Sequence, residues 1–267
     1  MAEGTNGERI VWYNTGYADD GYVNTYVSFD GSGEPPTTGT VPGSVLATGF
    51  CQGANYAIVE DVDSVTWDGP TRSWLYRIEQ AAKPQIVSEW TSASGFRPLS
   101  RTAACDDIGR LHVLHGSTGT RAAPPTDGPT LAVLDTRMPS EPVNTLLASP
   151  YTWRTPSGAI ALRDGQLLWV TSDGDVVQAA PKSMGVVRLW GLPSAVESGT
   201  VSLSPDGATV TAVIRSTSND FHYEQFDAAT GTPVAEPVPL PWLSEIVDTV
   251  TESGQSTYRL TDVESLR

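Results

Sequence analysis

The chain has 267 residues, 39% of them hydrophobic, with eight tryptophans and nine tyrosines, a composition that excludes a wholly disordered protein. Its formal net charge is −15, so nucleic acids and anionic lipid surfaces, which are bound through Lys and Arg, are poor candidates for partners. The 25 glycines and 20 prolines favour many tight turns, and no apolar run is long enough for a membrane-spanning helix.

Taken from the N-terminus, the sequence alternates between strand-like and turn-like segments, with little helical periodicity. Short runs of β-branched or aromatic residues bounded by Gly, Asp, Asn or Pro are typical of strands. The clearest examples are 56–59, 166–171 and 208–214. Residues 243–250 are the best candidate for a short helix, but the β-branched Ile246 and Val247 favour a strand there as well. The sequence therefore predicts an all-β protein.

Two strand patterns recur along the chain. The first is a strand, a polar turn that ends in Gly, and a second, apolar strand; it occurs at 47–59, 102–114, 159–170 and 201–213. The second is an alternating aromatic or aliphatic strand followed by a polar turn; it occurs at 24–33, 73–79, 130–135, 221–231 and 256–262. A repeat of about 40–55 residues with four strands is what a propeller blade requires, because each blade buries its faces only against its neighbours.

This repeat predicts one β-propeller domain over residues 1–267, with five or six four-stranded blades. The clearest blades are expected near 45–95, 96–154, 155–197 and 198–240. Segments 1–44 and 241–267 are each short for a blade, so we expect both termini to close the ring, which would leave no open sheet edge. Tandem β-sandwiches are the alternative, and they predict a period of about 100 residues.

One segment carries a family resemblance. Leu203-Ser-Pro-Asp-Gly-Ala-Thr-Val-Thr-Ala-Val213, followed by Tyr223-Glu-Gln-Phe-Asp-Ala-Ala-Thr-Gly231, resembles a repeat of the TolB and WD40-like propellers. The resemblance covers the blade at 198–240 and, in part, two more. Ser-Pro-Asp-Gly is a turn sequence, because Pro presets φ and Asp-Gly closes a hairpin. The resemblance therefore implies the fold and no chemistry.

The two cysteines occupy matching positions in neighbouring predicted blades. Cys51 and Cys105 each end the first strand of a repeat, just before a polar turn. Such strands lie close together in adjacent blades, so we expect a disulfide, which needs Cα atoms about 4.4–6.8 Å apart. Two buried thiols that pack as small apolar residues are the alternative. A disulfide indicates an extracellular or cell-envelope protein whose export signal is absent from this chain, whereas free thiols fit the cytoplasm.

The sequence contains no recognisable catalytic motif, whether a Gly-x-Ser-x-Gly elbow, a phosphate-binding loop or a Gly-x-Gly-x-x-Gly. His112 and His115 would point to opposite faces of one strand, so they do not form a shared metal site. Acidic pairs such as Asp61 and Asp63 fit either solvated turns or a structural calcium ion. We therefore expect no catalytic residue, no metal site and no cofactor, with a structural calcium ion as the alternative.

Tryptophans supply the candidate binding residues. Trp169 stands between Leu168 and Val170 and is expected in the core. Trp67 and Trp153 stand beside Asp68 and Arg154 in turn-like surroundings, where an exposed ring can stack on a sugar or anchor a protein. The candidate binding residues are Trp67, Asp68, Trp74, Tyr151, Trp153 and Arg154.

These observations predict a non-enzymatic recognition or scaffold domain that binds a protein or a glycan through one propeller face. The alternative is a hydrolase or lyase whose acidic residues converge at the central channel from separate blades. Convergent acids at the channel mouth would favour the enzyme, and exposed tryptophans on a flat face would favour binding.

Overall fold

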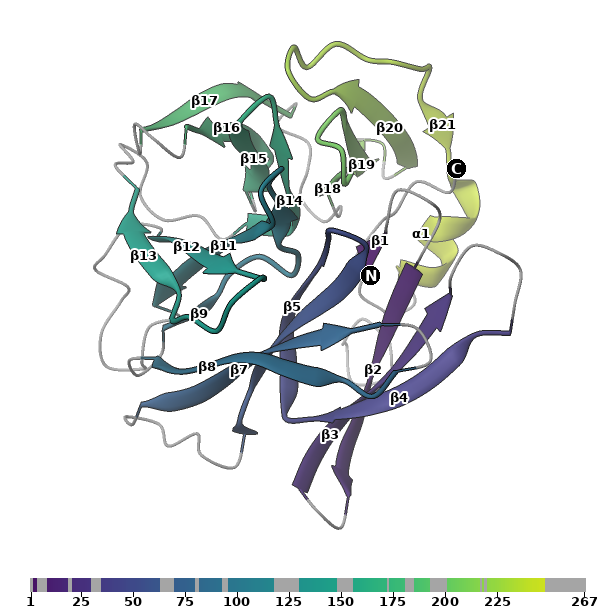
Figure 1. Ribbon diagram of the computed structural model, residues 1–267. Coiled ribbons are helices and arrows are strands. Elements are labelled where there is room, and N and C mark those ends of the chain that lie inside the picture. Colours follow the sequence, from purple (N-terminus) through teal and green to yellow (C-terminus); the bar gives the residue numbers. More distant parts are fainter. Residues whose placement is uncertain are drawn as a thin grey trace. The chain divides into compact units, whose positions relative to one another are not determined.

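The computed structural model describes residues 2–3, 9–18, 21–29, 35–62, 70–79, 82–92, 96–117, 130–147, 156–171, 173–180, 185–192, 201–216, 218 and 220–247. Within these ranges the chain forms five antiparallel sheets and one short helix. The protein is therefore all-β and has the five blades of a β-propeller (Figure 1), as predicted. The chain divides into two compact units, Met1–Trp153 and Arg154–Arg267, which are described separately.

The first unit holds three sheets, whose strands are joined mainly in chain order by antiparallel hairpins. The first sheet contains β1 (Ala2–Glu3), β2 (Arg9–Ala18), β3 (Gly21–Phe29) and β4 (Thr37–Pro42). The second contains β5 (Ser44–Cys51), β6 (Ala54–Glu60), β7 (Thr71–Ile78) and β8 (Gln85–Ser92). The third contains β10 (Ala104–Cys105), β11 (Arg110–Ser117), β12 (Thr130–Asp135) and β13 (Val143–Leu146), with β9 (Phe96–Pro98) paired to β11.

The second unit holds two sheets and the helix. The fourth sheet contains β14 (Pro156–Arg163), β15 (Gln166–Thr171), β16 (Asp175–Ala179) and β17 (Val186–Gly191). The fifth contains β18 (Val201–Leu203), β19 (Thr209–Arg215), β20 (Phe221–Asp227) and β21 (Val238–Pro239). Helix α1 (Pro241–Val247) follows.

The sequence predicted that both ends of the chain close the ring. Residues 1–44, which looked short for a blade, include a four-stranded sheet of their own. Ring closure by 1–44 and 241–267 stays a prediction, and residues 248–267 lie outside the described part of the chain.

Over residues 243–247 the expected strand is wrong, because residues 241–247 form helix α1, and residues 248–250 lie outside the described part of the chain. Pro241 occupies the first helical position, where its fixed φ suits a helix and its missing N–H costs nothing. Leu243 is buried against Val213 and Phe221 of the fifth sheet. This contact, which the local sequence does not reveal, favours the helix over the β-branched preference of Ile246 and Val247.

The Ser-Pro-Asp-Gly segment forms the tight turn that its sequence predicts. Gly207 has a φ of 68°, which only glycine adopts at little cost. The Ser204 hydroxyl oxygen accepts hydrogen bonds from the backbone N–H groups of Ala208 and Thr209. This turn joins β18 to β19 and sets their register, Leu203 opposite Val210.

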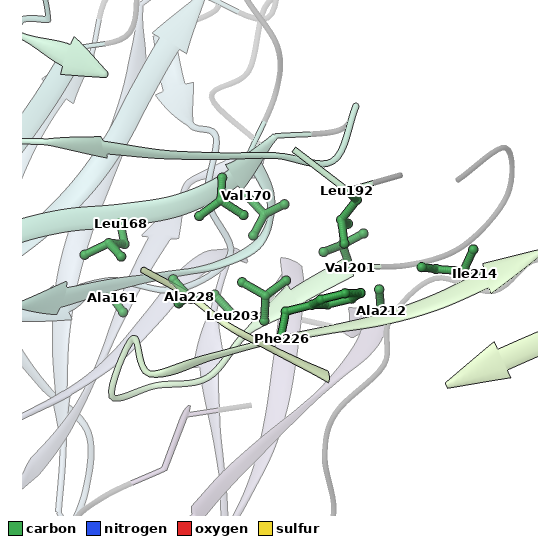
Figure 2. Packing of buried hydrophobic residues seen from close by; sticks show 12 residues of the cluster. Ala161, Leu168, Val170, Leu192, Val201, Leu203, Ala212, Ile214, Phe226 and Ala228 are labelled. Atoms are coloured by element: carbon green, nitrogen blue, oxygen red, sulfur yellow. The ribbon is translucent and has the colours of Figure 1, made fainter. Parts of the chain in front are cut away.

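Each unit has its own apolar layers between sheets. In the second unit, Figure 2 shows side chains of the fourth and fifth sheets gathered in one cluster, including Leu168, Val170, Leu203 and Phe226. Trp169 points to the other face of β15 and is 4% exposed, so its predicted burial is confirmed. In the first unit, one layer joins the first and second sheets through Ile10, Tyr26, Val41, Ala57, Val59, Tyr76 and Ile78.

The predicted disulfide joins Cys51 to Cys105, with Cα atoms 5.3 Å apart. The strands that carry the cysteines lie side by side. Thr48 forms a parallel bridge with Thr102, and the N–H of Thr48 donates to the carbonyl of Arg101. The N–H of Ala103 donates in turn to the carbonyl of Thr48. The second and third sheets are therefore linked at their first strands, as the matching positions of the cysteines predicted.

Candidate functional site

The structure describes only one of the six predicted binding residues. Trp67, Asp68, Tyr151, Trp153 and Arg154 lie outside the described residues, so their role stays a prediction. Trp74 lies on β7 and is half-buried. The guanidinium carbon of Arg72 lies 5.2 Å from the centre of the Trp74 ring. Tyr76 approaches the same ring edge-on, at 6.5 Å between centroids.

Arg72 is itself held by Glu89 of β8. The two side chains form an ion pair at 2.6 Å, and both are about half exposed. A cation over an indole ring, fixed by a carboxylate, covers one side of Trp74. Trp74 also packs against the apolar layer between the first and second sheets. The ring therefore supports its neighbours more than it offers a free stacking surface.

Tyr76, which approaches the Trp74 ring, also lines a groove between the outer strands of the first and second sheets. Its volume is about 910 Å³, within the range of small-ligand sites. It is lined by Tyr26, Thr37, Thr38, Gly39, Thr40, Pro42, Tyr76, Ala82, Lys83, Pro84 and Ile86. These residues come from β3, β4, β7, β8 and the turn between β7 and β8. The described lining combines hydroxyl groups, ring surfaces and one cation.

The position of Tyr26 depends on Gly39. The two residues are opposite each other on β3 and β4. A Cβ atom on residue 39 would overlap the Tyr26 hydroxyl and the adjacent ring carbons. The ring therefore lies flat across the glycine and occupies the space that a side chain would fill. A glycine inside a strand often marks such a close approach.

Both tyrosine hydroxyls of the groove remain protonated at neutral pH. Burial raises the pKa of Tyr26 above its ordinary value. Burial also raises the pKa of Tyr76, where Arg72 acts in the opposite direction and Glu89 adds to the increase. A protonated phenol can donate and accept one hydrogen bond each, which suits a ligand rich in hydroxyl groups.

Next to the groove, a buried donor lacks a partner. The indole N–H of Trp12 is buried and has no hydrogen-bond partner among the described residues. The Trp12 ring lies 5.3 Å from the Tyr26 ring, so it packs directly behind the groove wall. An unpaired buried donor has a free-energy cost of about 1–3 kcal/mol, which a water or ligand oxygen would remove.

This groove was not predicted from the sequence. Its clearest signal was Thr37-Thr-Gly-Thr40, a strand-like run interrupted by glycine. Tyr26 and Tyr76 belong to different repeats, and only the packing of the two sheets brings them together. Among the described residues, no cluster of three His, Cys, Asp or Glu side chains is arranged to hold a metal ion.

His112 and His115 lie on β11 of the third sheet and do not line the groove. His112 is buried, and its Nε2 lies 3.1 Å from the Asp106 carboxylate. Burial lowers the pKa of His112, and the contact with Asp106 partly offsets that effect. Burial would raise the pKa of Asp106, but hydrogen bonds from the Arg110 backbone, His112 and the Arg110 side chain lower it overall. The contacts of Asp106 with Arg110 and His112 thus fix the turn before β11.

Because His115 is buried, we expect the free energy of unfolding to fall in acid. Burial lowers its pKa from 6.5 to about 4 in the folded protein. The unfolded chain therefore binds the proton more tightly, and stability falls as the pH decreases from about 6.5 to about 4. The loss should approach about 3 kcal/mol at the acid end. Urea unfolding of the wild type and His115→Gln across this range measures it, because the variant should lose less stability.

His222→Gln serves as the control for that measurement, since His222 is only half-buried. It should keep the acid loss of the wild type. An equal acid loss in the wild type and His115→Gln would contradict the assignment to His115.

Comparisons with known proteins identify no family. No family model and no curated protein matches the chain. A candidate 6-phosphogluconolactonase from Bacteroides uniformis is 13% identical, over 95% of this chain and 74% of its own, with a TM-score of 0.49. The β-propeller domain of the Trilobed protease from Pyrococcus furiosus is 10% identical, over 82% of this chain and 62% of its own, with a TM-score of 0.46.

A third solved structure, the glutaminyl cyclase of Myxococcus xanthus, is 19% identical, over 78% of this chain and 76% of its own, with a TM-score of 0.42. Similarities at this level carry no argument about function. Among the described residues, no helix is both long and apolar enough to cross a membrane.

Proposed function

We propose that this protein is a non-enzymatic recognition domain that binds a glycan in the groove between its first and second sheets. The groove lining is the observation that supports the proposal. It combines Thr37 and Tyr26, whose side chains carry hydroxyl groups, with Tyr76 and the apolar Pro84. Tyr26 and Tyr76 reach the groove only with their edges, because they are 3% and 5% exposed. Sugars present hydroxyl groups and apolar ring faces together, so this mixture of side chains suits them.

We also propose that the protein works outside the reducing cytosol. The support is the disulfide between Cys51 and Cys105, because disulfides persist in oxidising compartments. An extracellular or cell-envelope protein with this groove would meet surface glycans. The predicted residues Trp67 and Trp153 remain candidates for further contacts on the same domain.

Filling the groove should abolish glycan binding. Gly39→Val places a branched side chain where the Tyr26 hydroxyl lies, which forces the ring into the groove. Overpacking of this kind also costs about 1–3 kcal/mol of stability. The measurement is binding of fluorescently labelled protein to an array of neutral, uronic-acid, sialylated and sulfated oligosaccharides. We expect at least one class to bind the wild type and none to bind the variant.

Asn144→Val is the matched control, because it adds the same side chain to exposed strand β13 of the third sheet. It should bind like the wild type. If the wild type binds no glycan on the array, the proposal is overturned and a protein partner becomes the alternative. Glycan binding that Gly39→Val leaves unchanged would place the binding site elsewhere.

A further inference from the structure

Lys83 stands out among the cations of the molecule. The chain has only two lysines, Lys83 and Lys182, within a net charge of −15. Most described arginines form ion pairs with carboxylates: Arg72, Arg77, Arg110, Arg137, Arg163 and Arg188. By contrast, no described carboxylate forms an ion pair with Lys83, which is exposed and lines the groove.

The carboxylates of the same hairpin are already neutralised. Glu79, at the end of β7, pairs with Arg77. Glu89, on β8, forms an ion pair with Arg72, and the Nε–H of Arg72 donates a hydrogen bond to the Glu89 carboxylate at 2.7 Å. Among the described residues, no carboxylate therefore neutralises the positive charge that Lys83 presents to the groove. A ligand that carries a carboxylate or sulfate would provide its missing partner.

The net charge of the protein opposes this attraction only weakly. At physiological ionic strength, charges separated by more than about 8 Å in solvent are largely screened. The distant carboxylates therefore contribute little, whereas an anionic group in direct contact with Lys83 is screened much less than they are. An oligosaccharide with one or two charges also meets less repulsion than a polyanion such as DNA.

We propose that the groove selects acidic saccharides, with Lys83 binding the carboxylate or sulfate while the threonine and tyrosine hydroxyls bind the sugar. This inference rests on the proposed function and narrows it to one class of glycan. The flexible stem of Lys83 keeps its ammonium in water until the ligand arrives, which limits the desolvation on binding. Tyr26 and Tyr76, both protonated, then contact the uncharged part of the ligand.

The test compares Lys83→Gln with the wild type on the same oligosaccharide array, followed by titration calorimetry with the strongest acidic ligand. The substitution keeps much of the side chain's length and polarity but removes its charge. We expect acidic oligosaccharides to bind the wild type best and Lys83→Gln to weaken that binding about tenfold. Binding of neutral oligosaccharides should change little.

Arg101→Gln is the control, since Arg101 is also exposed, forms no ion pair among the described residues and does not line the groove. It should bind acidic ligands like the wild type. The proposed selectivity would be overturned if the wild type preferred neutral glycans, or if Lys83→Gln bound acidic oligosaccharides as tightly as the wild type. Either result would leave the proposed glycan recognition standing. An array with no bound glycan would overturn both.

Discussion

Phe226→Ala is expected to lower the free energy of unfolding by about 3–5 kcal/mol. Phe226 lies on β20, is 4% exposed and belongs to the cluster between the fourth and fifth sheets (Figure 2). Its ring packs 5.6 Å from that of Trp190, whose indole N–H donates to the carbonyl of Ala228. Removing the ring leaves a cavity that these fixed neighbours cannot fill. Urea unfolding followed by circular dichroism and tryptophan fluorescence measures the loss.

Phe29→Ala is the control for this prediction. Phe29 ends β3 in the first unit and is 41% exposed, so the same truncation removes fewer contacts. Its effect should stay below about 1 kcal/mol. Equal losses for the two variants would show that Phe226 is not a core residue, and the assigned register of β19 and β20 would then be wrong.

Removing the disulfide should lower the free energy of unfolding by about as much as Phe226→Ala does. The bond closes a loop across a sequence separation of 54 residues. On the chain-entropy model such a loop stabilises the folded state by about 4 kcal/mol. The double variant Cys51→Ala/Cys105→Ala should therefore unfold at a lower urea concentration. A double variant avoids leaving one unpaired thiol, and alanine keeps the site at Cys51, which is 1% exposed, apolar.

The reductant dithiothreitol gives an independent measurement. It should destabilise the wild type to the level of the double variant and leave the double variant unchanged. Non-reducing mass spectrometry of protein made in an oxidising compartment should detect no free thiol. Two free thiols there would contradict both the bond and the proposed location outside the cytosol.

The fold could be predicted from the sequence because its signals are local and repeated. The turn at Gly207 and the continuous apolar run around Trp169 each follow from short-range rules. Cys51 and Cys105 could be paired because the repeat placed them at matching positions. The helix at 241–247 could not be predicted, because burial of Leu243 against the fifth sheet decides it.

The groove could not be predicted for a related reason. Tyr26, Gly39 and Tyr76 are unremarkable within their own strands, and only the packing of two separate sheets brings them together. Five of the six binding residues predicted from the sequence lie outside the described residues. The one that the structure describes, Trp74, carries Arg72 over its ring and supports the adjoining layer.

The bond between Cys51 and Cys105 also determines how the chain would respond to mechanical tension. When the two ends are pulled apart, force travels from one cysteine to the other through the sulfur atoms, so the loop between them bears no load. That loop includes most of the second sheet and the start of the third. A fully stretched chain would be shorter by roughly 180 Å, at about 3.4 Å for each of the 54 residues of separation. Under such tension, part of the groove wall, including Tyr76 and Lys83, would thus be protected from extension.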